Sequence, residues 1–110
     1  MEKAVLFSLE NSHIKILMQI YFNDKEQLYF DGYDCGKIPE QAFGNSTYEY
    51  SYAIEPEEVN KFYPLFDLKY GDKSGLLRCI KKEFSTNKAY TLFGEFMLTH
   101  NIQHERFTWC

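Results

Sequence analysis

The sequence predicts a single α+β domain over residues 1–110, with an antiparallel four- to five-stranded sheet and helices packed on one of its faces. Three observations lead to this class. Apolar and polar residues alternate up to Ile54, the spacing becomes helical from Pro56, and alternation returns over residues 103–109. Because no linker or repeat interrupts the 110 residues, we expect one core and the element order ββββ-ααα-β.

The first three strands are predicted at residues 4–9, 13–22 and 27–31. The second strand alternates most clearly, and its apolar face is formed by Ile14, Ile16, Met18, Ile20 and Phe22. Short polar turns separate the three segments, and connections of this length favour an antiparallel meander.

Residues 32–46 are predicted to leave the sheet as a loop. Gly32 and Gly36 can adopt positive φ, and Pro39 has no N–H to donate to a neighbouring strand. We therefore expect irregular chain there, with one helical turn over residues 39–43. A fourth strand follows at residues 47–54, and one of its faces carries Tyr48, Tyr50, Tyr52 and Ile54.

Three helices are predicted between Pro56 and residue 100. Pro56 suits a first helical position, the glutamates after it suit the positive end of the helix dipole, and Pro64 keeps this helix short. A second helix follows a cap at Asp72 or Ser74, and a third spans residues 88–100. The alternation that resumes at residue 103 predicts a final strand, which ends near residue 109.

Aromatic residues make up 18% of the chain, and nine of them are tyrosines. A small core accepts phenylalanine readily, whereas each buried tyrosine hydroxyl needs a hydrogen-bond partner. Some tyrosines are therefore expected on a surface that contacts another molecule, where tyrosine is enriched. They could equally cover a solvent-exposed sheet face.

The three cysteines are far apart in sequence, and the first ten residues are too short and too acidic for a signal peptide. No segment approaches the roughly 18 apolar residues of a membrane span. We therefore expect a reduced, cytoplasmic protein with free thiols.

Charge is concentrated in the middle of the chain. Residues 24–58 contain nine acids and two bases, whereas residues 59–110 contain eight bases and five acids. Direct nucleic-acid binding requires a clustered basic face, so the acidic middle argues against it. The same segment suits a protein partner with a basic surface, or forms a solvated acidic face.

Candidate metal and phosphate sites are weak in this sequence. His100 and His104, with Cys110 or Cys35, have the spacing of zinc ligands on a helix, but Asn101 is expected to end the helix between them. The glycine-flanked segment at residues 71–75 lacks the spacing of a phosphate-binding loop. We expect no metal and no cofactor.

A catalytic or cation-binding group is possible around Asp31, Asp34 and Cys35. The Cys35 thiol lies next to Asp34, and a neighbouring negative charge disfavours the thiolate. The two aspartates could bind a divalent cation, but they lack calcium-loop spacing and are common in turns.

Three segments together resemble a group of small, largely uncharacterised bacterial α+β proteins. The segments are Phe30-Asp31-Gly32-Tyr33-Asp34-Cys35-Gly36, Phe43-Gly44-Asn45-Ser46-Thr47-Tyr48-Glu49-Tyr50 and residues 102–109, and the first two follow a GxDxG…FGxSxYEY layout. At the level of class, the size and composition are also similar to those of immunity proteins that neutralise bacterial toxins. The first resemblance carries no catalytic residue, and the second implies a protein partner.

These observations predict a non-enzymatic inhibitor that binds a cationic protein, as an immunity protein binds its toxin, and that is a monomer or a homodimer. The expected contact residues are Asp31, Tyr33, Asp34, Glu40, Tyr48, Glu49, Tyr50 and Tyr52. One alternative is a phage-encoded, anti-CRISPR-like inhibitor of a bacterial defence system. The other is a small enzyme or ligand-binding domain that uses Asp31, Asp34 and Cys35.

Overall fold

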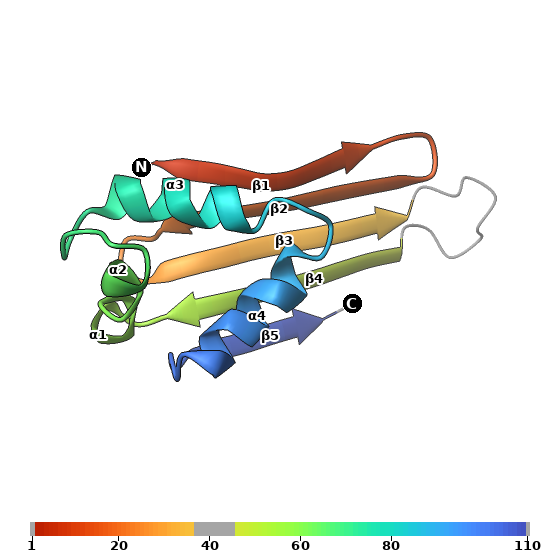
Figure 1. Cartoon of the computed structure of the whole chain (residues 1–110). Coiled ribbons are helices and arrows are strands. Elements are labelled where there is room, and N and C mark those ends of the chain that lie inside the picture. The colour runs from red at the N-terminus through yellow and green to blue at the C-terminus, as the bar shows by residue number, and fades with distance from the viewer. Residues whose placement is uncertain (1, 37–45, 110) are drawn as a thin grey trace.

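The computed structural model describes residues 2–36 and 46–109, and it confirms the α+β class. Five antiparallel strands form one sheet in the order β1-β2-β3-β4-β5. All helices in the described ranges lie on one side of this sheet (Figure 1). The strands are β1 (Lys3–Glu10), β2 (Ile14–Phe22), β3 (Leu28–Gly36), β4 (Ser46–Ile54) and β5 (Glu105–Trp109).

The predicted first helix is present as two short helices, α1 (Pro56–Val59) and α2 (Phe62–Leu65). Helix α3 (Lys73–Glu83) is capped by Asp72, the first of the two predicted caps, because the Asp72 carboxylate accepts a hydrogen bond from the amide of Gly75 at 3.0 Å. Helix α4 (Ala89–Thr99) completes the set and leads into β5.

Strand β3 is longer than predicted, and the assignment of residues 32–36 to a loop is wrong. Gly32 is paired with Tyr50 of β4 and with Met18 of β2, so it lies inside the sheet. Its lack of a side chain makes room for the Tyr50 ring: a Cβ at this position would lie 2.8 Å from Cζ of Tyr50. Gly32 therefore supplies space between strands and not a positive φ. The helical turn predicted at residues 39–43 lies outside the described residues.

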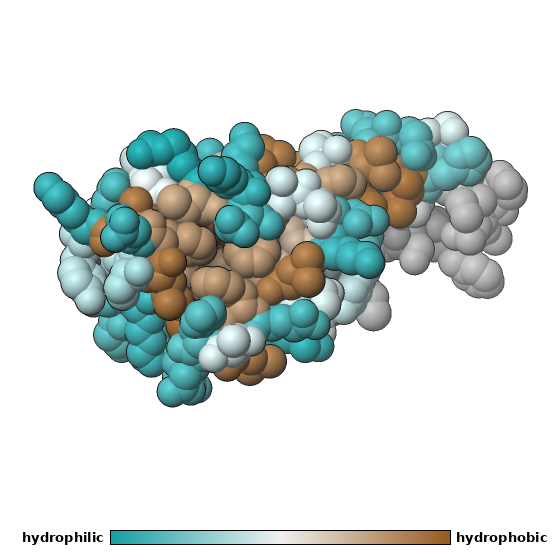
Figure 2. Space-filling model, viewed as in Figure 1, coloured by the Kyte–Doolittle hydropathy of each residue, from teal (hydrophilic) through white to brown (hydrophobic). Residues whose placement is uncertain are grey.

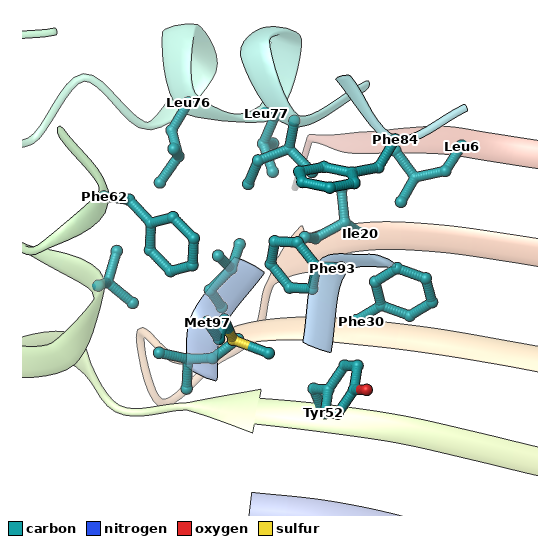
Figure 3. Close-up of a cluster of buried hydrophobic side chains, with 14 of the residues drawn as sticks. Leu6, Ile20, Phe30, Tyr52, Phe62, Leu76, Leu77, Phe84, Phe93 and Met97 are labelled. Atoms are coloured by element: carbon teal, nitrogen blue, oxygen red, sulfur yellow. The ribbon is translucent and has the colours of Figure 1, made fainter. Parts of the chain in front are cut away.

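The core fills the space between the sheet and the helices. Leu76 and Leu77 of α3 and Phe93 and Met97 of α4 point into the space between the helices and the sheet, where Phe62 of α2 also lies (Figure 3). The Phe93 ring stacks on Phe62 at a centroid distance of 5.7 Å and an angle of 8°. Rings of this size bury much apolar surface each, which explains how a small domain uses so many aromatic residues.

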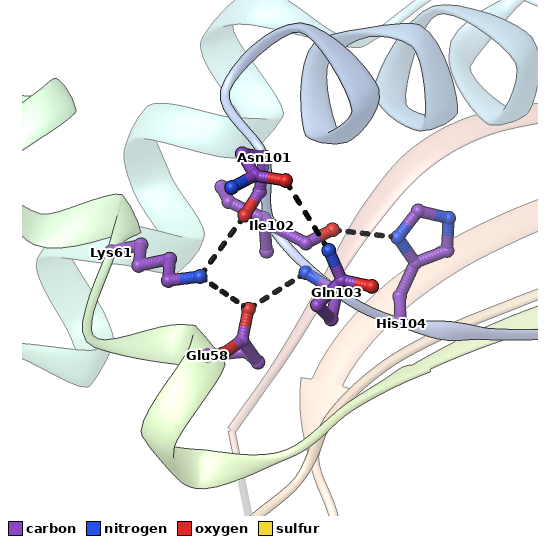
Figure 4. Close-up of polar contacts among 6 residues, drawn as sticks. All are labelled: Glu58, Lys61, Asn101, Ile102, Gln103 and His104. Carbon is purple, nitrogen blue, oxygen red and sulfur yellow. Dashed lines mark hydrogen bonds and ion pairs between the residues drawn. The ribbon is translucent and has the colours of Figure 1, made fainter.

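A polar network joins α1 to the segment between α4 and β5 (Figure 4). One oxygen of Glu58 accepts hydrogen bonds from Nζ of Lys61 at 2.8 Å and from the amide of Gln103 at 2.7 Å. Lys61 also donates to the carbonyl of Asn101 at 3.0 Å. These contacts hold the chain where it turns back toward the sheet, and so they help to position β5. The Lys61 hydrogen bond is the main cause that lowers the pKa of Glu58.

Candidate functional site

In the described ranges no helix covers the second face of the sheet, which is called the open face below. Side chains alternate between the two faces of a strand, so the open-face residues are those between the core positions. On β2 to β5 they are Lys15, Leu17, Gln19, Tyr21, Tyr29, Asp31, Tyr33, Cys35, Thr47, Glu49, Ser51, Ala53, Glu105 and Phe107. Most of these side chains are half-buried or exposed, and two small residues of β4, Ser51 and Ala53, lie buried between their larger neighbours.

The open face has an acidic half, which consists of its residues on β3, β4 and β5. The register places Tyr33 opposite Glu49, and it places Ser51 between Asp31 and Phe107. Phe107 is 39% exposed, so an apolar ring lies among the carboxylates. The lysines of this face are on β1 and β2 instead. Lys15 of β2 donates a hydrogen bond to the Tyr33 hydroxyl, and this bond is the main cause that raises the pKa of Lys15. The face is therefore acidic and aromatic toward β5.

A hollow of about 320 Å³ continues the acidic half at the end of β4. Its lining residues are Ala53, Glu55, Glu57, Glu58, Gln103, His104 and Glu105. Four of them are glutamates, and Glu58 is already engaged by Lys61. Glutamates gathered next to an open sheet face produce a negative potential that attracts a basic surface.

The opposite face of the sheet contains a groove of about 460 Å³ between α4 and the strands β3, β4 and β5. Its walls include Tyr48, Tyr50 and Tyr52 of β4, with Asp34 of β3 at one end. Helix α4 contributes Tyr90, Thr91, Gly94, Glu95 and Leu98, and β5 contributes Arg106. In Figure 1 the strands extend beyond the start of α4, and in Figure 2 hydrophobic residues are visible at that end of the sheet, near the β1–β2 connection.

The structure distributes the predicted contact residues over both faces. Asp31, Tyr33 and Glu49 lie on the open face. Asp34, Tyr48, Tyr50 and Tyr52 line the groove. Glu40 lies outside the described residues. Because the predicted third strand ended at Asp31, its alternation was not extended to Asp34. The eight residues therefore do not form one surface.

Two of the expected contact residues, Tyr50 and Tyr52, are buried, because each is only 4% exposed. The Tyr52 ring stacks on Tyr90 of α4 at 4.2 Å, and its hydroxyl donates to the Tyr90 carbonyl at 3.1 Å. The Tyr50 hydroxyl donates to Asp34 Oδ1 at 2.8 Å. Burial, followed by this contact with Asp34, raises the pKa of Tyr50 well above its usual range. Tyr48, which is 42% exposed, does reach the surface.

Asp31, Asp34 and Cys35 do not form one site. Asp31 and Cys35 are on the open face, whereas Asp34 is on the other side of the sheet. Within residues 2–36 and 46–109, no three His, Cys, Asp or Glu side chains are grouped as metal ligands would be. The geometry therefore removes the basis for a catalytic or cation-binding site made of these three residues.

Several residues of both surfaces were not predicted from the sequence. Glu105 and Phe107 are two residues apart in the predicted final strand, so the sequence predicts that they share a face. It does not predict that β4 is the strand next to them. Tyr90 and Arg106 reach the groove only through the packing of α4 and β5 against β4. The signal for these residues lies in the strand order and not in local spacing.

Comparisons with known proteins complete the description. No family model, curated protein or solved structure matches this chain. Among the described residues, no helix is both long enough and apolar enough to cross a membrane. The resemblances stated for the sequence therefore stay predictions, and the function is argued from the two surfaces themselves.

Proposed function

We propose that the protein is a non-enzymatic inhibitor that binds a partner protein with a basic surface, in the manner of an immunity protein that neutralises a toxin. The acidic half of the open face is the proposed contact surface. The observation that carries the proposal is an uncovered sheet face on which aromatic rings and carboxylates alternate without a lysine or arginine on its β3, β4 or β5 positions.

The dimensions of the open face suit a protein partner. Strands β2, β3 and β4 are each nine residues long. With a rise of about 3.3 Å per residue and a strand spacing of about 4.8 Å, the whole open face, which includes β1 and β2 beside the acidic half, measures roughly 20 by 30 Å. A stable complex buries roughly 800 Å² on each partner, which is comparable.

The composition of the acidic half favours recognition of a basic protein. Carboxylates such as Asp31 and Glu49 accelerate the encounter with a basic surface and select against acidic partners. Tyr33 and Phe107 provide ring area that loses little conformational entropy on binding. The adjoining glutamate hollow offers a place for one lysine or arginine of the partner.

The proposal is tested by capturing the partner with the tagged protein and measuring affinity for the purified partner. The variant Asp31→Asn/Glu49→Gln removes two charges from the open face, and Asp24→Asn/Glu83→Gln removes two exposed acids elsewhere as a matched control. We expect a basic partner whose affinity falls about tenfold in the first variant and is unchanged in the second. We also expect weaker binding at high salt.

The role as an inhibitor is tested separately on the purified partner. If the partner is a toxin, the protein should restore growth of cells that express it; inhibition of a defence protein would instead support the phage-derived alternative. An acidic partner, or equal affinity of the open-face variant and the parent, would contradict the proposed surface.

A further inference from the structure

We propose that the groove between α4 and β3–β5 is a binding site for an alkylguanidinium group, as carried by an arginine side chain. The guanidinium would lie at the end of the groove formed by Asp34, Tyr48 and Tyr50. This site is on the opposite face from the proposed inhibitory surface and does not depend on it.

Asp34 supplies an oriented negative charge at this end. The Tyr50 hydroxyl donates to Oδ1 of Asp34 at 2.8 Å, and it fixes the carboxylate in the wall of the groove. Among the side-chain hydrogen bonds and ion pairs between described residues, none other involves the Asp34 carboxylate. Its second oxygen can therefore accept from a ligand, and an N–H···O⁻ bond is stronger than a neutral one.

Three tyrosine rings form a concave wall next to this carboxylate. The centroids of Tyr48 and Tyr50 are 5.5 Å apart, and those of Tyr50 and Tyr90 are 4.7 Å apart. The ring faces carry negative electrostatic potential, so they attract a planar cation. A guanidinium combines stacking on such rings with a forked hydrogen bond to a carboxylate, which a lysine ammonium does not.

The charge distribution along the groove selects a cation at the Asp34 end. Besides the four tyrosines, the titratable lining residues are Asp34 and Glu95, which are acidic, and Arg106 and His104. Arg106 is paired with Tyr52, whereas Asp34 is paired with Tyr48, so they lie at different ends of the groove. Along the strands, Asp34 and Arg106 are four residues apart, which corresponds to about 13 Å. Across the sheet they are two strand spacings apart, which is about 10 Å, so Arg106 does not occupy the Asp34 end.

The groove has the size expected for such a ligand. Its volume of about 460 Å³ falls within the range of small-molecule sites, roughly 300–1,000 Å³. Thr91 and Asn87 of the lining can hydrogen-bond the backbone that carries the arginine side chain. Leu98, which is 74% exposed, offers apolar contact along the same helix.

The test is titration of the purified protein with N-acetyl-L-arginine methylamide, followed by NMR of the tyrosine rings. The corresponding citrulline derivative has nearly the same shape without the charge and serves as the matched ligand. We expect the arginine derivative to bind with a Kd of about 1–10 mM, and the citrulline derivative to bind at least tenfold more weakly.

Three variants locate the site. Asp34→Asn keeps an acceptor for the Tyr50 hydroxyl and should lower the affinity for the arginine derivative about tenfold. Tyr48→Leu should lower the same affinity about threefold. Asp31→Asn, on the open face, should bind like the parent. Thermal unfolding verifies that each variant is folded. Equal binding of the two derivatives, no effect of Asp34→Asn, or no binding up to about 50 mM in the folded parent would overturn the proposal.

Discussion

Replacing Gly94 with alanine should destabilise the protein, although alanine is the better helix former. Gly94 lies in the middle of α4, and a Cβ built there overlaps the Tyr52 hydroxyl and lies 3.0 Å from Tyr52 Cζ. In an unconstrained helix the substitution would stabilise by about 1 kcal/mol. Here the added methyl must displace either the tyrosine or the helix.

Displacing the Tyr52 side chain is costly, because it is buried and both its ring and its hydroxyl make specific contacts. Its ring stacks on Tyr90, and its hydroxyl donates to the Tyr90 carbonyl. Overpacking costs about 2 kcal/mol, and loss of the hydrogen bond costs about 1 kcal/mol. With the helix propensity subtracted, we expect Gly94→Ala to lower the free energy of unfolding by about 2 kcal/mol, which corresponds to a Tm about 10 °C lower.

Urea denaturation followed by circular dichroism measures this change, and a double mutant isolates its cause. In Tyr52→Phe the hydroxyl is absent, so adding Gly94→Ala to that background should cost at least about 1 kcal/mol less than in the parent. Leu98→Ala, at an exposed position of the same helix, should change stability by less than about 0.5 kcal/mol. A Gly94→Ala variant as stable as the parent would refute the close approach of α4 to β4.

Three further predictions concern the helix cap and two groups with shifted pKa values. Asp72→Ala should cost about 1 kcal/mol in urea denaturation, because it removes the N-terminal cap of α3; a smaller loss than from Asp72→Asn would contradict this role. The pKa of Glu58 is lowered from 4.5 in the folded protein. The stability that ionised Glu58 contributes is therefore present above pH 4.5 and is lost as pH falls through the lower folded pKa. Glu58→Gln should flatten the fall in Tm between pH 5 and 3, and an unchanged pH profile would count against the network. The pKa of Tyr50 is raised from 10.0, so the unfolded chain ionises first and stability falls above that pH. Tyr50→Phe should weaken this alkaline loss of stability, and an unaltered slope would show that the Tyr50 hydroxyl is not buried in the folded protein.

Local spacing was sufficient to predict most elements of the fold. The alternation of Ile14 to Phe22, the proline at position 56 and the cap at Asp72 each depend on neighbours in sequence. The prediction failed at Gly32, because a glycine inside a strand and a glycine in a turn look alike locally. What distinguishes them is the Tyr50 ring on the adjacent strand, and its position depends on the register.

The candidate surfaces were harder to predict than the elements. The sequence shows that acidic and tyrosine residues gather near the centre of the chain. The face of the sheet on which each of them lies depends on where β3 ends. Because β3 extends to Gly36, Asp31 and Asp34 belong to one strand and lie on opposite faces of the sheet. Arg106 and Tyr90 meet Tyr52 only after α4 and β5 have packed, and this arrangement has no signature in the local sequence.

The position of β5 has a consequence for the order of folding. Strands β1 to β4 pair with their neighbours along the chain, whereas the pairing of Ala53 with Glu105 closes a loop that contains helices α1 to α4. Closing a long loop costs entropy before its contacts form, so β5 is expected to join the sheet late. During synthesis the meander would then emerge first, with the edge of β4 open until the ribosome has released the rest of the chain. An unpaired edge of this kind is prone to pair with other chains, so the speed with which β5 docks would govern the yield of folded protein.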